Sequence, residues 1–172
     1  MNTLFFDIDG TLINTGGAGK AAMVDAMRRQ SGRGEVPLDI LVAGRSDRSI
    51  GRELFERNNL KDTVENWDEF VDHYIRGLRV NLPQRPGQVL PGVLSFVEAM
   101  HARDDVAMGL ITGNIQTSAQ LKLEHFGLWH FFHFGGYGDQ HINRDDIARD
   151  AMAAAREHLG GNNYDPSRVW VI

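Results

Sequence analysis

The feature that most constrains the fold is a short apolar segment, residues 4–6 (LFF), which leads directly into an acidic turn at residues 7–11 (DIDGT). A short, fully apolar and aromatic-rich run is typical of a strand buried on both faces of a parallel sheet. Ligands of such sheets gather at the carboxyl ends of the strands, where this turn would lie. The start of the chain therefore predicts a parallel sheet with a polar site at its edge.

The segment that follows is predicted to be helical. We expect one helix over residues 18–27, ended by residues 32–34 (GRG), and a second from the N-cap Ser46 to Phe55. A third begins at Thr63, where apolar residues recur at three- and four-residue spacing to Leu78. Residues 16–82 therefore contain helices and no convincing strand.

Beyond a linker rich in proline and glycine at residues 83–92, helices and strands are predicted to alternate. The expected elements are helix 93–100, strand 106–111, helix 115–125, strand 131–134, helix 147–159 and strand 169–172. Such alternation indicates a right-handed parallel α/β sheet, to which the first strand also belongs. The expected fold is a Rossmann-like α/β core of residues 1–15 plus 84–172, with residues 16–83 inserted as an all-helical cap.

Composition and charge restrict the class of protein. Apolar residues make up 42% of the chain and charged residues 24%, which is an ordinary globular composition. There is no cysteine, so disulfides, thiolate metal sites and cysteine nucleophiles are excluded. The net charge is −5, with 18 scattered basic residues, which disfavours nucleic-acid and anionic membrane partners. With neither a signal peptide nor a membrane span in the pattern, we expect a soluble cytoplasmic protein. Nothing in the pattern indicates an oligomeric state.

Two carboxylates, Asp7 and Asp9, are the strongest candidates for chemistry. One of two carboxylates at this spacing can act as a nucleophile held against a cation, while the other exchanges protons with the leaving group and then with water. The alternative interpretation is a polar turn with Asp-Gly at its tip.

A second candidate site follows the strand predicted at 106–111. Thr112, Gly113 and Asn114 lead into a helix, and a hydroxyl beside backbone N–H groups can hold a phosphate. The same sequence is also compatible with an ordinary strand-to-helix turn. Arg144 precedes the helix that begins near the acidic pair at 145–146, and by itself indicates only a solvated side chain.

Taken together, these motifs resemble the haloacid dehalogenase superfamily of phosphohydrolases, and most closely its phosphoglycolate-phosphatase-like members with a helical cap. The resemblance covers essentially the whole chain. It implies that Asp7 is the nucleophile, which becomes an aspartyl phosphate, and that Asp9 is the general acid and then the general base. It further implies that the Asp7 carboxylate and the Asp9 backbone carbonyl bind Mg²⁺.

The resemblance also implies a phosphate-binding set. Thr112 would hold a phosphoryl oxygen together with Asn114 and with backbone N–H groups near Gly10, Thr11 and Gly113.

The third motif of the family is usually a lysine about 30 residues after the second. Here the arginine Arg144 lies 32 residues after Thr112, and Lys122 is the alternative candidate. By resemblance to the specificity loop of the family, Arg45 would meet an anionic leaving group; a plain surface loop is the alternative.

The leading hypothesis is therefore a Mg²⁺-dependent phosphatase that acts on a small phosphorylated metabolite, phosphoglycolate-like by resemblance. A phosphomutase of the β-phosphoglucomutase kind would use the same residues. A non-enzymatic alternative is a phospho-acceptor module like a response-regulator receiver, which also combines acids, a hydroxyl and a basic residue.

The last residues, 168–172 (RVWVI), predict a buried strand. In the family that the chain resembles, further acidic residues follow this strand and complete the magnesium site. We therefore expect that the sequence is part of a longer protein, and that these residues alone bind magnesium weakly unless another acid, such as Asp139, serves as a ligand.

Overall fold

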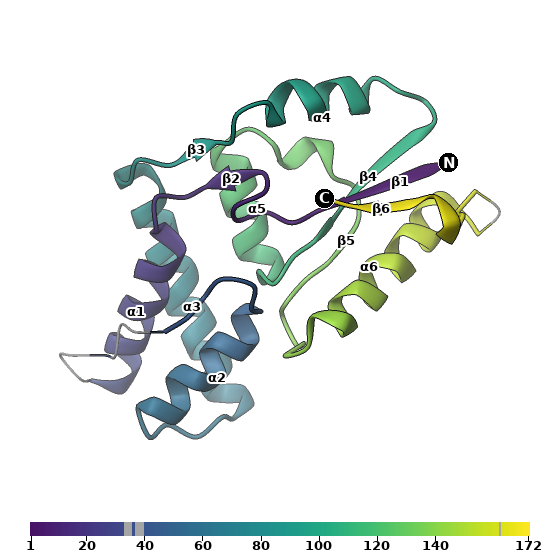
Figure 1. The fold of residues 1–172 in the computed structure, drawn as a ribbon. Helices are drawn as coiled ribbons and strands as arrows, with labels where there is room; N and C mark the ends of the chain where they lie inside the picture. Colours follow the sequence, from purple (N-terminus) through teal and green to yellow (C-terminus); the bar gives the residue numbers. More distant parts are fainter. Residues whose placement is uncertain (33–35, 37–39, 162) are drawn as a thin grey trace.

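The computed structural model describes residues 1–32, 36, 40–161 and 163–172 (Figure 1). The expected end of the first helix at Arg33 and Gly34 lies outside these residues. Within them, parallel strands form a sheet in the order β5-β4-β1-β6. These strands are β1 (Asn2–Phe6), β4 (Val106–Ile111), β5 (Gly135–Gly136) and β6 (Val169–Val171). The parallel α/β sheet predicted from the sequence is therefore confirmed.

The helices of the described chain begin and end close to the predicted positions. They are α1 (Ala18–Ser31), α2 (Asp47–Arg57), α3 (Val64–Asn81), α4 (Val93–His101), α5 (Gln116–His125) and α6 (Arg144–Leu159), with short 3-10 turns η1 (Leu82–Gln84), η2 (Trp129–Phe131) and η3 (Pro166–Arg168). The largest difference in a helix start is at α6, which begins at Arg144 rather than at 147.

Helices cover both faces of the sheet, and successive side chains of β1 point to opposite faces. Phe5 faces α6 and packs with Ala151 and Ala155. Leu4 and Phe6 point to the opposite face, where their cluster includes side chains of α4 and α5. The apolar start of the chain is thus buried from both sides, which holds the first residues after β1 at a fixed place on the sheet edge.

The segment between β1 and β4 is helical, as predicted, with no strand among its described residues from 16 to 82. Ser46 and Thr63 act as the expected N-caps, since their hydroxyls accept hydrogen bonds from the N–H groups of Ser49 and Asn66, both at 3.2 Å. Helices α1, α2 and α3 share a buried cluster of apolar side chains, to which Ile115 beside α5 also belongs.

Two short strands that the sequence did not predict connect this helical segment to the sheet. They are β2 (Ile13–Asn14) and β3 (Gln88–Val89), which pair antiparallel. The chain therefore leaves the sheet and returns to it through adjacent strands, which lie side by side in Figure 1.

Two predicted strands differ from the structure. The aromatic run 131–134 is not a strand: Phe131 ends the turn η2, and β5 lies just after the run, at two glycines. Strand β6 is present but not buried, because 59% of Trp170 and 67% of Val171 remain exposed. It pairs with β1, and in the described chain no strand pairs with its other edge.

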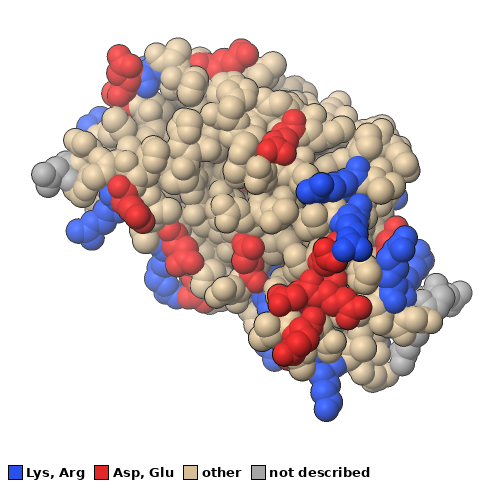
Figure 2. Space-filling view, turned by 180° about the vertical axis from the view of Figure 1, so that it is seen from behind, with Lys and Arg blue, Asp and Glu red and all other residues tan. Residues whose placement is uncertain are grey.

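Within the described residues, no helix is both long and apolar enough to cross a membrane. On the face shown in Figure 2, acidic and basic side chains lie intermixed and gather towards the helical segment, and that face carries no broad basic patch.

The close approach of β4 to the segment before β5 depends on a glycine. A Cβ on Gly109 would collide with the ring of Phe134, which itself packs edge-on against Phe5 with ring centroids 5.7 Å apart. We expect Gly109→Ala to lower the free energy of unfolding by about 1–3 kcal/mol through overpacking. Urea unfolding measures this, with Gly161→Ala as the control because only Arg156 lies within 4 Å of the added Cβ. Equal midpoints for the two variants would contradict the prediction.

Candidate active site

The acidic turn lies where β1 ends. Asp7 directly follows the strand, and its Oδ1 atom accepts a hydrogen bond from the N–H of Ile8 at 2.8 Å. Its Oδ2 atom lies 3.1 Å from Nη2 of Arg144, the first residue of α6. Burial of β1 thus places the Asp7 carboxylate at the sheet edge, where the α6 N-terminus supplies a cation.

The turn then reverses at Gly10, which adopts a φ of +84° that favours glycine. The N–H of Gly10 donates to the carbonyl of Ile13 at 2.9 Å, and that of Thr11 to the carbonyl of Ile8 at 3.3 Å. These two N–H groups therefore shape the turn, and they are not free to hold phosphate as the resemblance implied.

Asp9 faces a different cation. Its Oδ2 atom lies 2.6 Å from Nζ of Lys122, on α5, and accepts a hydrogen bond from Nδ2 of Asn114 at 2.9 Å. Removal of water around the carboxyl favours a higher pKa for Asp9. The charge of Lys122 and the hydrogen bonds from Lys122 and Asn114 outweigh it, so the pKa lies below its usual value of 3.8. Asp9 is therefore held as a carboxylate.

The turn after β4 brings the second predicted motif to the same place. The Thr112 hydroxyl accepts hydrogen bonds from the N–H and Nδ2 of Asn114, at 3.2 and 2.8 Å. The other amide atom of Asn114, Oδ1, accepts from Nζ of Lys122 at 2.6 Å. Thr112 is fully buried, so in this structure its side chain orients Asn114.

A cavity of ≈ 280 Å³ opens between the sheet edge and the helical segment. Most predicted site residues line it, namely Asp7, Asp9, Arg45, Gly113, Asn114, Lys122 and Arg144. Gly10, Thr11 and Thr112 lie outside this lining. Residues of α1, α2 and α3, among them Lys20, Asp47 and Tyr74, close the opposite side. The structure thus brings both candidates for the third motif, Arg144 and Lys122, into one cavity, each on a different aspartate.

Arg45 lines this cavity, but its guanidinium points elsewhere. It pairs with the carboxylate of Glu53 and donates to the Ser49 hydroxyl at 3.1 Å and to the Ser49 carbonyl at 2.9 Å. The donors expected to meet an anionic leaving group are therefore occupied within α2 and the loop before it.

Sequence reasoning missed one acidic residue of the site, Asp47. It is 5% exposed, and its Oδ2 atom accepts hydrogen bonds from the N–H of Ile115 at 3.0 Å and from the Ser118 hydroxyl at 3.1 Å. Burial raises the pKa of Asp47 to about 6, although the charge of Lys122 opposes this. An acid in the first turn of a helix is ordinarily a surface feature, so the sequence carried no signal of its burial.

The candidate magnesium ligands differ in how far their side chains are already engaged in other contacts. Among the described residues, no group of three acidic or histidine side chains lies close enough together to hold a metal. Mg²⁺ usually needs only one or two carboxylates, since it keeps several waters and binds substrate phosphate. The Asp7 carboxylate fits this requirement. The side chain of Asp9 is paired with Lys122, so the backbone carbonyl of Asp9 is the group that would bind the metal. Asp139 accepts a hydrogen bond from the N–H of Gln116 at 2.9 Å and does not line the cavity.

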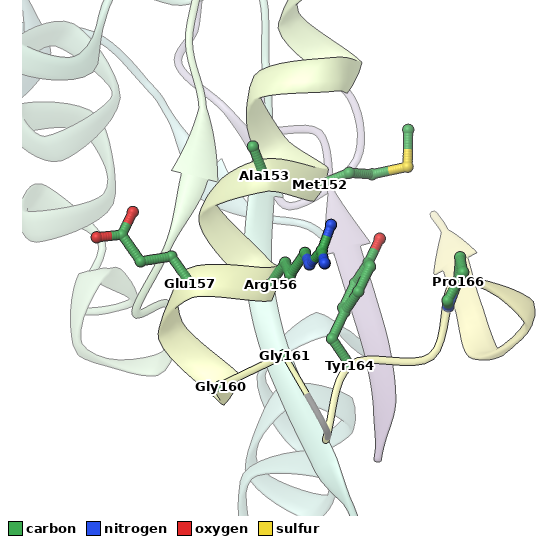
Figure 3. Close-up of a pocket in the computed structure, with 8 residues that line it drawn as sticks. All are labelled: Met152, Ala153, Arg156, Glu157, Gly160, Gly161, Tyr164 and Pro166. Carbon is green, nitrogen blue, oxygen red and sulfur yellow. The ribbon is translucent and has the colours of Figure 1, made fainter.

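A wider hollow of ≈ 620 Å³ lies near the C-terminal end of α6, away from these residues (Figure 3). Arg156 and Tyr164 lie next to each other there, while Glu157 points away from them. None of the predicted site residues lines this hollow, whereas most of them line the smaller cavity.

Comparison with known proteins identifies the family of the chain. A family model described as "Hydrolase: haloacid dehalogenase-like hydrolase" matches residues 1–172. The chain belongs to this family. The resemblance inferred from its motifs is thereby confirmed.

Individual relatives are more distant. The "Probable phosphatase IndB" of Dickeya dadantii is 30% identical over 134 residues, which cover 75% of this chain and 55% of that protein. The chain thus spans about half the length of this curated relative.

Solved structures of haloacid dehalogenase-like proteins share the fold. CbbY from Rhodobacter sphaeroides, in complex with phosphate, superposes with a TM-score of 0.63 at 18% identity, over 99% of this chain and 77% of that one. A predicted phosphoglycolate phosphatase from Haemophilus somnus gives 0.61 at 17%, over 99% and 76%. A "putative beta-phosphoglucomutase" from Thermotoga maritima gives 0.55 at 23%, over 99% and 75%.

The two cations of the site should contribute differently to stability. The side chain of Lys122 is 4% exposed and that of Arg144 is 37% exposed. We expect Lys122→Met to lower the free energy of unfolding by about 2–3 kcal/mol, because it leaves Asp9 and the buried Asp47 without their cation. Arg144→Met should cost less than about 1 kcal/mol, as for other exposed pairs. Urea unfolding at pH 7 measures both, and the reverse order would contradict this assignment.

The raised pKa of Asp47 gives stability a specific dependence on pH. A carboxyl whose pKa is about 6 when folded and about 4 when unfolded destabilises the folded state as pH rises through that interval. The groups facing it are Lys122, Asp9 and Tyr74. We expect the unfolding free energy of Asp47→Asn, relative to wild type, to rise by about 2 kcal/mol between pH 4 and pH 7.

Urea unfolding of both proteins across this pH range measures the difference. The control is Asp62→Asn, since Asp62 is an exposed acid that pairs with Arg48 on the same helical segment. Parallel curves for wild type and Asp47→Asn would show that Asp47 does not titrate as the structure indicates.

Proposed function

We propose that the protein is a Mg²⁺-dependent phosphatase that hydrolyses a small phosphorylated metabolite through an aspartyl phosphate on Asp7. One observation carries the proposal. Two carboxylates two residues apart open onto one cavity, and each is held by its own cation, Asp7 by Arg144 and Asp9 by Lys122. That arrangement separates a nucleophile from a proton carrier.

Asp7 is the proposed nucleophile. The N–H of Ile8 fixes its Oδ1 atom, so the carboxylate has one defined orientation towards the cavity. Attack of a carboxylate oxygen on phosphorus would form the acyl phosphate and break the bond to the leaving oxygen. Arg144, 3.1 Å from Oδ2, would neutralise charge on the phosphoryl oxygens as they gather at this edge.

Asp9 is the proposed acid and base. It would protonate the leaving oxygen and then take a proton from the water that attacks the acyl phosphate. Its present contacts with Lys122 and Asn114 favour the carboxylate, the form that activates water. An incoming phosphoryl group would compete for both donors and so release the carboxyl to be protonated.

The remaining donors would hold the phosphoryl group. Lys122 and Asn114 both line the cavity, and Thr112 orients the Asn114 amide. The turn at Gly113 leads into the N-terminus of α5, where backbone dipoles favour an anion. When bound at the Asp7 carboxylate and the Asp9 carbonyl, Mg²⁺ would supply further neutralisation of phosphoryl charge.

The size of the cavity supports a small substrate. A volume of ≈ 280 Å³ lies near the lower end for small-molecule sites, and residues of the helical segment close it on one side. That lid would exclude water while the aspartyl phosphate forms. Phosphoglycolate is the substrate class suggested by the resemblance, and the name of the Dickeya relative supports a phosphatase.

The test is Mg²⁺-dependent release of phosphate from p-nitrophenyl phosphate by the full-length protein. Asp7→Asn should lower turnover by several orders of magnitude, because an amide is a poor nucleophile and carries no charge for the metal. The matched control is Asp145→Asn, which removes an exposed acid from the first turn of α6. Wild-type turnover in Asp7→Asn would end the mechanism, and a single stoichiometric phosphorylation would favour the receiver-like alternative.

A further inference from the structure

The N-terminus of α5 has no cap of its own. Its N-cap residue is Ile115, whose aliphatic side chain cannot accept a hydrogen bond from the backbone N–H groups of the first turn. Acids from two other segments serve instead. Asp139 accepts from the N–H of Gln116 at 2.9 Å. Asp47, at the start of α2 and 68 residues before Ile115, accepts through Oδ2 from the N–H of Ile115 at 3.0 Å. The same oxygen accepts from the Ser118 hydroxyl at 3.1 Å. An acid of the helical segment thus caps the helix that carries Lys122.

The contact is reciprocal. The N–H of Asp47, at the first residue of α2, donates to the carbonyl of Gly113 at 2.7 Å. Gly113 has room for this approach only as glycine, because a Cβ there would collide with the carbonyl of Arg45. Ser46 is fully buried beside them, and its hydroxyl donates to the carbonyl of Ile142 at 3.3 Å. The start of α2 and the turn before α5 therefore each supply a hydrogen-bond partner to the other.

We propose that Asp47 is a positioning residue for phosphate binding. By docking the start of α2 on the turn 112–114, it holds that turn and Lys122 in the geometry that binds a phosphoryl group. The role assigned to the phosphoryl group rests on the proposed function, whereas the docking contact does not. Asp47 itself need not touch the ligand.

Charge alone predicts the opposite effect on binding. Asp47 lines the cavity and carries a carboxyl near Lys122, so its negative charge opposes an anion there. Removing only the charge should strengthen phosphate binding. Removing the hydrogen-bond acceptor as well should weaken it, because the turn and α5 would have to be ordered by the ligand. Loss of the charge and loss of the hydrogen-bond acceptor should therefore change phosphate affinity in opposite directions.

Asp47→Asn and Asp47→Ala make this separation, because both remove the charge and only asparagine keeps an acceptor oxygen. The probe is inorganic phosphate, titrated calorimetrically with Mg²⁺ present into the full-length protein. We expect Asp47→Asn to bind at least as tightly as wild type and Asp47→Ala about tenfold more weakly than Asp47→Asn, the effect of one or two hydrogen bonds. Equal affinity of the two variants, or tighter binding by Asp47→Ala, would overturn the proposal.

Hydrogen exchange provides a readout that needs no catalysis. Amide exchange in residues 112–122 should be faster in Asp47→Ala than in Asp47→Asn, whereas Asp62→Ala should leave it unchanged. If Asp47→Ala does not fold, Asp47→Ser replaces it, because its shorter side chain cannot reach Ile115. Unchanged exchange would overturn the docking role. Altered exchange and phosphate affinity in a protein without phosphatase turnover would preserve that role and overturn the proposed function.

Discussion

The site depends on one buried ammonium group, that of Lys122. It lies 2.6 Å from the Asp9 carboxylate and 2.6 Å from the Asn114 amide oxygen, and its charge also acts on Asp47. A buried cation needs such partners, since its desolvation is otherwise costly. The partners come from the end of β1, the turn after β4 and the start of α2. The lysine therefore links the sheet edge to the helical segment, and the geometry of the cavity follows from satisfying its charge.

The sheet and the helices were largely predictable because short stretches of sequence indicate them, through apolar runs, apolar periodicity and N-cap residues. The LFF run at residues 4–6 places apolar side chains on both faces of the strand. Ser46 and Thr63 are good N-cap residues, and each directly precedes a segment with helical spacing of apolar residues. Strand β5 was not predictable in the same way. It consists of two glycines, whose lack of side chains leaves no hydrophobic pattern. The strand was therefore predicted at the adjacent aromatic run, residues 131–134. The pairing of β2 with β3 joins residues 76 and 74 positions apart, so no local sequence pattern indicates it.

The candidate site was predictable where it consists of motifs and not where it depends on contacts between distant segments. Asp7, Asp9 and Asn114 lie at the cavity because strand ends bring them there. Arg144 and Lys122, the two candidates for the third motif, both reach the cavity, and each pairs with a different aspartate. The direction of Arg45 is set by Glu53, and the burial of Asp47 by Ser118. Both partners are ordinary surface residue types, so the sequence did not distinguish these pairs from solvated ones.

The β2–β3 pair has a consequence for how this architecture tolerates change. The chain leaves and re-enters the sheet region at Ile13 opposite Val89 and at Asn14 opposite Gln88, so everything between is a loop whose ends are already joined. The entropy of closing such a loop grows only with the logarithm of its length, by about 0.6 kcal/mol for each doubling. A segment held in this way can be lengthened, shortened or exchanged for another at little cost to the sheet. Packing of the sheet therefore fixes the position of Asp7, whereas the length of the helical segment can change wherever its contacts with the turn before α5 are kept.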